Sequence, residues 1–128
     1  MSNLNTGLAG FGKRDDWTVE IDELIDVNLY GIAIHNNRFT FQVSGFPLNR
    51  IVEFQQFLRT RPKDQTFSLH KGPTGRVDCA EHDDRLFLRL INNGECGANL
   101  AEFAIEAPEC DLLAAAVEEA IKDAESPG

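Results

Sequence analysis

The sequence predicts an α+β fold in which an antiparallel sheet of about six to seven strands carries two helices packed on one face, in the order βββαββββα. Seven short segments alternate apolar and polar side chains with a period of two, which is typical of strands with one solvated face. Two longer segments repeat apolar residues every three or four positions, as amphipathic helices do. Turn-forming residues separate these segments, and no internal sequence repeat is evident.

The chain is expected to begin with a flexible arm over residues 1–14. Its glycines and small polar residues offer no periodic apolar side that could be buried. A single α+β domain follows over residues 15–124, because a chain of 128 residues can bury one hydrophobic core. The last residues, 125–128, are expected to fray.

The first half of the domain is predicted to form a three-stranded meander followed by a helix. Alternation predicts strands in residues 17–22, 30–34 and 39–43. After the break at Pro47, apolar residues at helical spacing predict a helix of about 11 to 14 residues that stops at Pro62.

The second half is predicted to form four strands and a final helix. Asn93 with Gly94 is the strongest hairpin signal in the sequence and predicts a tight turn between the last two strands. Pro108 in the first turn and an apolar stripe from Leu112 to Ile121 predict the helix. The four strands are expected at residues 67–69, 77–79, 86–90 and 101–105.

The net charge of −9 makes nucleic acid a poor partner, because phosphate binding would oppose the overall field. The charge is also uneven along the chain. Residues 1–64 hold 7 basic and 8 acidic groups, whereas residues 65–128 hold 5 basic and 13 acidic groups. A basic partner is therefore expected to interact mainly with the second half.

The sequence favours a cytoplasmic protein that does not bind membranes. The N-terminus has no apolar stretch behind a basic start, and no segment approaches the roughly 20 apolar residues of a membrane span. Three cysteines form no regular framework, which is typical of reduced thiols.

A metal site is one candidate, because His70, Cys79, His82 and Cys96 are of the types that bind zinc. Strand alternation directs Cys79 and His70 to opposite faces, so these two cannot hold the same ion. We therefore predict no metal site.

An acidic cluster around His82 is a second candidate, since carboxylates beside an imidazole can serve acid–base chemistry or hold a hard cation. A solvated hairpin tip is the favoured interpretation, because the alternating pattern of a calcium loop is absent. The cluster consists of Asp78, Glu81, Asp83 and Asp84.

Cys110 and the N-terminal glycines are not expected to form a reactive or phosphate-binding site. Cys110 begins a helix, but Glu109 and Asp111 place negative charge beside its thiol. Glycines 7, 10 and 12 resemble a phosphate loop, but no strand precedes them and no helix follows. No catalytic residue and no cofactor are predicted.

The strongest functional signal is an aromatic residue between two arginines. Phe87 and Ile91 lie on the face opposite Leu86, Leu88 and Leu90. Phe87 is flanked there by Arg85 and Arg89, and an aromatic residue among arginines is typical of protein-binding patches. The alternative is that another segment covers them. We define the candidate interface as Asp83, Asp84, Arg85, Phe87, Arg89 and Ile91.

The order of elements over residues 17–123 resembles that of small immunity-type and accessory proteins, which neutralise a partner by binding it. The resemblance lies in layout alone and carries over no residue. It implies a non-catalytic module that binds another, basic protein.

Two alternatives to this function stay open. One is a homodimeric structural domain that buries Phe87 and Ile91 across a two-fold axis. The other is an enzyme or small-ligand binder with a pocket between helix and sheet. Its titratable groups would be Tyr30, His35, His70 and His82.

Overall fold

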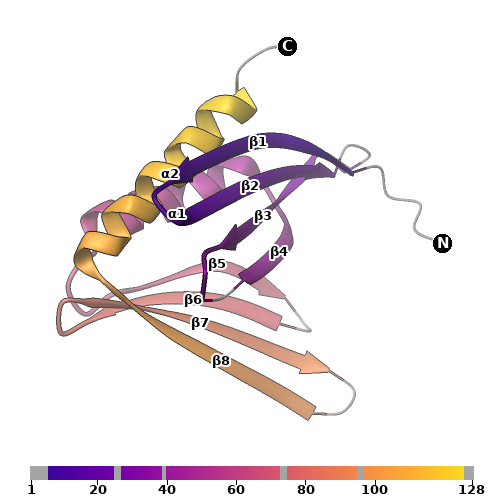
Figure 1. Cartoon of the computed structure of the whole chain (residues 1–128). Helices are drawn as coiled ribbons and strands as arrows, with labels where there is room; N and C mark the ends of the chain where they lie inside the picture. The colour runs from indigo at the N-terminus through magenta and orange to yellow at the C-terminus, as the bar shows by residue number, and fades with distance from the viewer. Residues whose placement is uncertain (1–5, 25–26, 39, 73–74, 95–96, 126–128) are drawn as a thin grey trace.

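A computed structural model describes residues 6–24, 27–38, 40–72, 75–94 and 97–125. It contains two successive units, each with four strands followed by a helix (Figure 1). The first unit consists of β1 (Thr6–Arg14), β2 (Trp17–Leu24), β3 (Leu29–His35), β4 (Thr40–Phe46) and α1 (Leu48–Thr60). The second consists of β5 (Thr66–Gly72), β6 (Gly75–His82), β7 (Arg85–Gly94), β8 (Gly97–Glu106) and α2 (Ala107–Glu125).

The strands form two antiparallel meanders of four strands each, which we call the N-terminal sheet (β1–β4) and the C-terminal sheet (β5–β8). The predicted α+β class with antiparallel strands and two helices is confirmed. The strands are divided between two sheets, whereas six to seven strands were expected in one. Alternation identifies the buried side of a strand but not the strand beside it.

The strand added to the predicted order is β1, in residues expected to be a flexible arm. It pairs with β2 along its length, from residue 6 to residue 14. A Cβ on Gly10 would overlap the carbonyl oxygen of Ala120 in α2, and one on Gly12 would overlap that of Ala116. Because glycines occupy the inner side of β1, the strand lacks the alternation that would have predicted it.

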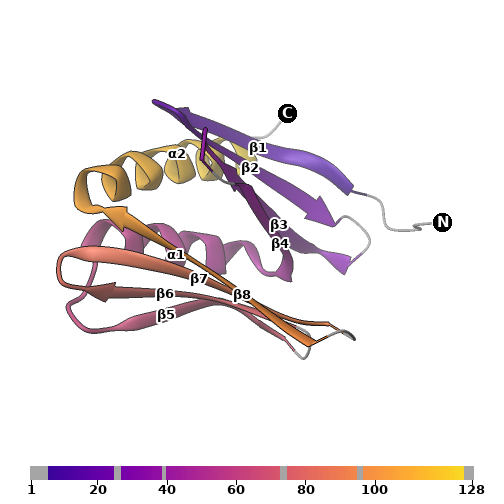
Figure 2. The ribbon, with the colours of Figure 1, turned by 60° about the horizontal axis from the view of Figure 1, so that its bottom comes forward.

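The two helices lie between the two sheets (Figure 2). α2 contacts β1 and β2 of the N-terminal sheet as well as β7 and β8 of the C-terminal sheet. α1 contacts β3 and β5, and the helices contact each other. They therefore cover the inner faces of both sheets, whereas one face of a single sheet was expected.

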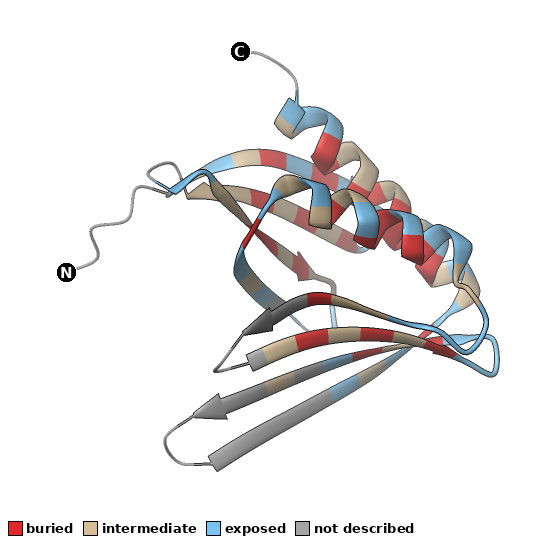
Figure 3. Ribbon diagram, turned by 180° about the vertical axis from the view of Figure 1, so that it is seen from behind, coloured by how far each residue is buried: buried red, intermediate tan, exposed pale blue. Residues whose placement is uncertain are grey.

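The hydrophobic core fills the space between the helices and the sheets, where the buried residues gather (Figure 3). Trp17, Phe54 and Leu113 are among its largest fully buried side chains, and each such burial stabilises the fold by about 1.5–3 kcal/mol. The strands bury the side chains that alternation assigns to the inner side, including Val19, Ile21, Ile32, Ile34, Val77, Cys79, Leu86, Leu88 and Ile105.

α1 ends where the sequence predicts, just before Pro62. Arg61 adopts a left-handed conformation with φ of 42°, and its N–H donates to the carbonyl oxygen of Phe57 at 2.8 Å. α2 extends to Glu125, and residues 126–128 lie outside the described residues. None of the described helices is long and apolar enough to cross a bilayer.

Candidate functional site

The candidate interface lies on the outer face of the C-terminal sheet, turned away from the helices. Arg85, Phe87, Arg89 and Ile91 occupy alternate positions along β7, and Leu86 and Leu88 between them are buried. Phe87 and Ile91 are half-buried, whereas the two arginines are exposed. The alternation of β7 thus brings these four predicted residues together on one face.

Asp83 and Asp84 form the turn between β6 and β7 at one end of this face. Their φ angles of 53° and 62° are those of a type I′ turn, which matches the twist of a hairpin. Both side chains are exposed. The turn sets His82 opposite Arg85 and so fixes the register of β6 against β7.

The register of β6, β7 and β8 arranges the outer face in rows that cross the three strands. Phe87 lies between Ala80 on β6 and Ala104 on β8. Because the alanine side chains are short, the ring of Phe87 projects beyond its two neighbours on the outer face. Ionic rows lie on either side, formed by Asp78, Arg89 and Glu102 and by His82, Arg85 and Glu106.

Both arginines of the candidate interface pair with glutamates of β8. Arg89 donates from Nε and Nη2 to Oε2 of Glu102 at 2.9 and 2.7 Å. Nε of Arg85 lies 3.1 Å from Oε1 of Glu106. The aromatic ring is therefore flanked by ion pairs rather than by free cations. Sequence analysis expected Glu102 and Glu106 on the exposed side of their strand, but the candidate interface did not include them or the two alanines, because the pairing of neighbouring strands was unknown.

A shallow hollow of about 250 Å³ lies beside Phe87. Ala80, His82, Arg89 and Glu102 complete its lining. The ring of His82 is tilted by 51° to that of Phe87, with centroids 6.5 Å apart. An aromatic residue within a charged rim is typical of protein contacts, and the hollow is smaller than the roughly 300–1,000 Å³ of ordinary ligand pockets.

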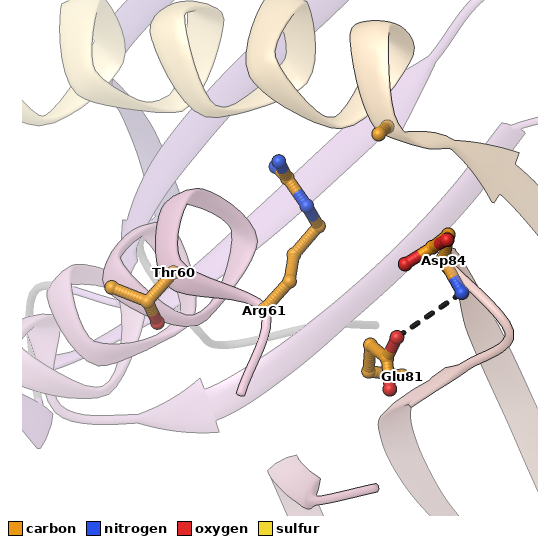
Figure 4. Close-up of a pocket in the computed structure, with 5 residues that line it drawn as sticks. Thr60, Arg61, Glu81 and Asp84 are labelled. Carbon is orange, nitrogen blue, oxygen red and sulfur yellow. Dashed lines mark hydrogen bonds between the residues drawn. The ribbon is translucent and has the colours of Figure 1, made fainter. Parts of the chain in front are cut away.

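A second hollow, of about 460 Å³, opens where α1 ends and α2 begins (Figure 4). Glu81 at its edge is nearly buried, and its carboxylate accepts the N–H of Asp64 at 2.9 Å and that of Asp84 at 3.2 Å. The bond from Asp64 is the main cause that lowers the pKa of Glu81, while burial acts in the opposite direction. The hollow is lined by Thr60, Arg61, Glu81, Asp84 and Ala107.

The acidic cluster considered from the sequence is divided between different parts of the sheet. Asp78 lies on the outer face, where it accepts a hydrogen bond from Oγ of Ser68 at 2.7 Å. Glu81 accepts hydrogen bonds from the backbone of two turns, and these bonds lower the pKa of its carboxyl group. Asp83 lies beside His82, with Oδ2 3.3 Å from Nε2, and both side chains are exposed. The four carboxylates therefore do not gather at a single site.

The cysteines of the core are inert thiols. Cys79 lies on the inner side of β6, and Cys110 lies in the first turn of α2 with Sγ 3.7 Å from the carbonyl oxygen of Ile105. Burial raises the pKa of both thiols, that of Cys110 to about 12. Cys96 and the side chain of His70 lie outside the described residues, among which no group of three or more His, Cys, Asp or Glu side chains is placed to hold a metal ion.

The remaining titratable residues of the predicted ligand site lie apart. Tyr30 packs against the hydrophobic core. His35 lies on the outer face of the N-terminal sheet, with Nε2 3.6 Å from Oε1 of Glu20. His82 belongs to the other sheet, so these three side chains do not share a pocket.

No protein-family model matches the chain, and no curated protein matches its sequence. The fold is similar to that of a solved structure described as "Crystal structures of trypanosoma bruciei MRP1/MRP2", with a TM-score of 0.52 and 10% sequence identity. The match covers 94% of this chain and 84% of that chain. At this level of identity the likeness extends to the fold alone.

Proposed function

We propose that this protein is a non-catalytic protein-binding module whose partner docks on the outer face of the C-terminal sheet. The observation that carries the proposal is the row of Ala80, Phe87 and Ala104 between two ionic rows. The short side chains on both sides of the aromatic ring leave room for an apolar side chain of a partner. The paired charges around it would exclude water and fix the orientation.

The charge of the chain supports a basic partner. The net charge is −9, and the half that contains this face carries 13 acidic and 5 basic residues. The exposed Asp83 and Asp84 add negative charge at one end of the face. Complementary fields accelerate encounter and disfavour wrong partners, which suits an immunity-type or accessory protein.

The proposal is tested by replacing both Phe87 and Arg89 with alanine. The immobilised wild-type chain and the variant are each incubated with an extract of the source cells, and captured proteins are quantified by mass spectrometry. We expect a basic protein whose capture falls about 30-fold in the variant, the effect of losing a hot spot of about 2 kcal/mol. The melting temperature should change little.

Phe11→Ala is the matched control, because Phe11 is an aromatic residue of the other sheet and is 45% exposed. This variant should capture the basic protein as the wild type does. Equal capture by all three chains would exclude the face around Phe87 as the docking surface.

A homodimer is the competing function, because Phe87 and Ile91 are two half-buried apolar side chains on one face. A two-fold axis through this face would bury both in each copy. Light scattering after size exclusion separates the two functions. A mass of one chain, 14.3 kDa, at every concentration contradicts the homodimer and supports a face that is available to a partner.

A further inference from the structure

The edges of the two sheets are not equally covered. Unpaired backbone groups at an edge can pair with another chain, so most proteins cover them. In β1 the N–H of Phe11 donates to Oδ2 of Asp123 in α2 at 3.0 Å. In β5 the carbonyl oxygen of Ser68 accepts from Arg50 in α1, and β4 contacts β5. A side chain of a helix thus bonds to the backbone of β1 and another to that of β5, and β4 lies against β5.

β8, the fourth edge strand, contacts α2, the helix that follows it directly in the chain. The strand pairs with β7, and no described strand pairs with its other side (Figure 1). In the tight turn at residues 83–84, the N–H and C=O groups of Arg85 point to His82 on β6. Because successive residues of a strand point these groups to opposite sides, those of Leu86 point to its partner Ile105 on β8. By the same alternation, the N–H and C=O groups that point to the free edge belong to Glu102, Ala104 and Glu106.

The space beside this edge is open. A hollow of about 250 Å³ borders β8 and is lined by Glu102, Phe103, Ala104 and Arg38. Arg38 belongs to the connection between β3 and β4, and its Nη2 donates to Oε2 of Glu109 in α2 at 2.6 Å. The ion pair fixes one side chain of this lining, and an added strand would enter the hollow beside β8.

The charge along the edge selects the occupant. Phe87 and the two arginines beside it form a basic–aromatic–basic column on β7, whereas β8 presents the acidic–small–acidic column of Glu102, Ala104 and Glu106. A further strand that continues this alternation carries basic, apolar and basic residues at alternate positions. A second copy of β8 would instead bring two acidic columns together, and like charges opposite each other are destabilising.

We propose that β8 receives an extended segment of a basic partner, which adds to the C-terminal sheet as a fifth, antiparallel strand. Two basic side chains of the segment lie beside Glu102 and Glu106. An apolar side chain between them lies beside Ala104, whose small side chain leaves room toward Phe87. This inference rests on the proposed protein-binding function and specifies the chemistry of the partner.

A synthetic peptide tests the inference without knowledge of the partner. The probe is fluorescein-labelled Ser-Lys-Thr-Val-Thr-Lys-Ser, and its binding to the full chain is followed by fluorescence anisotropy. We expect saturable binding that slows amide exchange at Glu102, Ala104 and Glu106. Replacing both lysines of the peptide with glutamate, or methylating the valine nitrogen, should weaken binding about tenfold or more, because each change removes a charge-assisted contact or a backbone hydrogen bond.

Ala104→Pro tests the edge from the side of the protein. Proline removes the N–H that points to the free edge and is tolerated on edge strands, so the ladder with β7 should persist. We expect binding of the peptide to fall about tenfold, whereas Ala104→Ser, which keeps the N–H, should bind nearly as the wild type does. Circular dichroism checks the fold of both variants, and the N-methylated peptide provides the same test on the unmodified chain.

The outcomes separate this inference from the proposed function. A wild-type chain that does not bind the lysine peptide, or that binds the N-methylated peptide equally well, overturns strand addition. If extract capture still depends on Phe87 and Arg89 in that case, the protein-binding function stands and its partner uses the face alone. If capture is independent of those residues as well, both proposals fail.

Discussion

The two sheets protect their outermost strands in different ways. α2 lies so close to β1 that glycines are required at residues 10 and 12, and Arg14 of β1 pairs with Glu119 of the helix. β8 has no such cover on its free side among the described strands, but it carries Glu102 and Glu106. One edge is therefore closed by packing, whereas the other carries acidic side chains, which disfavour pairing with a second copy of the same edge.

The outer faces of the sheets also differ in how their acids are compensated. On the N-terminal sheet, Asp22 lies on the same side of β2 as Glu20, and burial together with the charge of Glu20 raises the pKa of Asp22. On the C-terminal sheet, Glu102 and Glu106 each pair with an arginine. On the C-terminal face, these two glutamates are therefore compensated by arginines of the neighbouring strand.

Gly12→Val should have the largest effect, because it opens the covered edge. The new side chain would overlap the backbone of α2 at Ala116 and push the helix from β1. We expect a loss of about 3 kcal/mol or more in the free energy of unfolding, at the upper end of overpacking effects. Urea denaturation measures it. Lys13→Val, which places the same side chain at the next and exposed position, should change stability little, and an equal loss in both variants would contradict the close packing.

The sequence predicted the buried side of most strands, because alternation depends on side chains within a single segment. It did not predict β1, where Gly10 and Gly12 replace the apolar side chains that would have shown a period of two. The packing of α2 against this strand depends on residues more than 100 positions apart. A local pattern does not contain that information.

The sequence predicted only the part of the candidate site that lies on a single strand. Its residues on β7 share one strand, so alternation grouped them. A turn at Asn93 and Gly94 would have placed Glu102 opposite Arg85, but β7 continues to Gly94, which pairs with Gly97, and Glu102 lies opposite Arg89. A turn displaced by two residues shifts the partner by four, so the ion pairs and the alanines beside Phe87 followed only from the register.

Glu81→Gln should have the next largest effect, and the effect should depend on pH. Because hydrogen bonds from Asp64 and Asp84 lower the pKa of Glu81 below its ordinary value of 4.5, its carboxylate stabilises the fold above that value. This stability is lost as the pH falls through the lowered pKa. The variant should therefore melt at a lower temperature at neutral pH and show a weaker acid-induced decline, measured calorimetrically between about pH 6 and pH 3. If the variant lost stability at acidic pH as steeply as the wild type does, the Glu81 carboxylate would not be the acceptor of these hydrogen bonds.

Arg89→Ala should affect stability less. The pair with Glu102 is well aligned, but both side chains are exposed, with relative accessibilities of 52% and 39%. Pairs of this kind contribute at most about 1 kcal/mol. Chemical denaturation of the single variants and of the double variant with Glu102→Ala measures the coupling. A coupling free energy well above about 1 kcal/mol would show that the Arg89–Glu102 pair makes a large contribution to the stability of the C-terminal sheet.

Asp22→Asn should give the smallest effect and the opposite sign to Glu81→Gln. Because the pKa of Asp22 is raised above its ordinary value of 3.8, the folded state binds its proton more tightly, and stability is lost as the pH rises through this range. Asparagine removes the ionised form, so the variant should melt slightly higher than the wild type at neutral pH and equally well below pH 3.8. The gain should shrink in a Glu20→Gln background, since the charge of Glu20 contributes to the raised pKa. A lower melting temperature at neutral pH would mean that the Asp22 carboxylate is compensated as the acids of the C-terminal sheet are, and the contrast between the two faces would disappear.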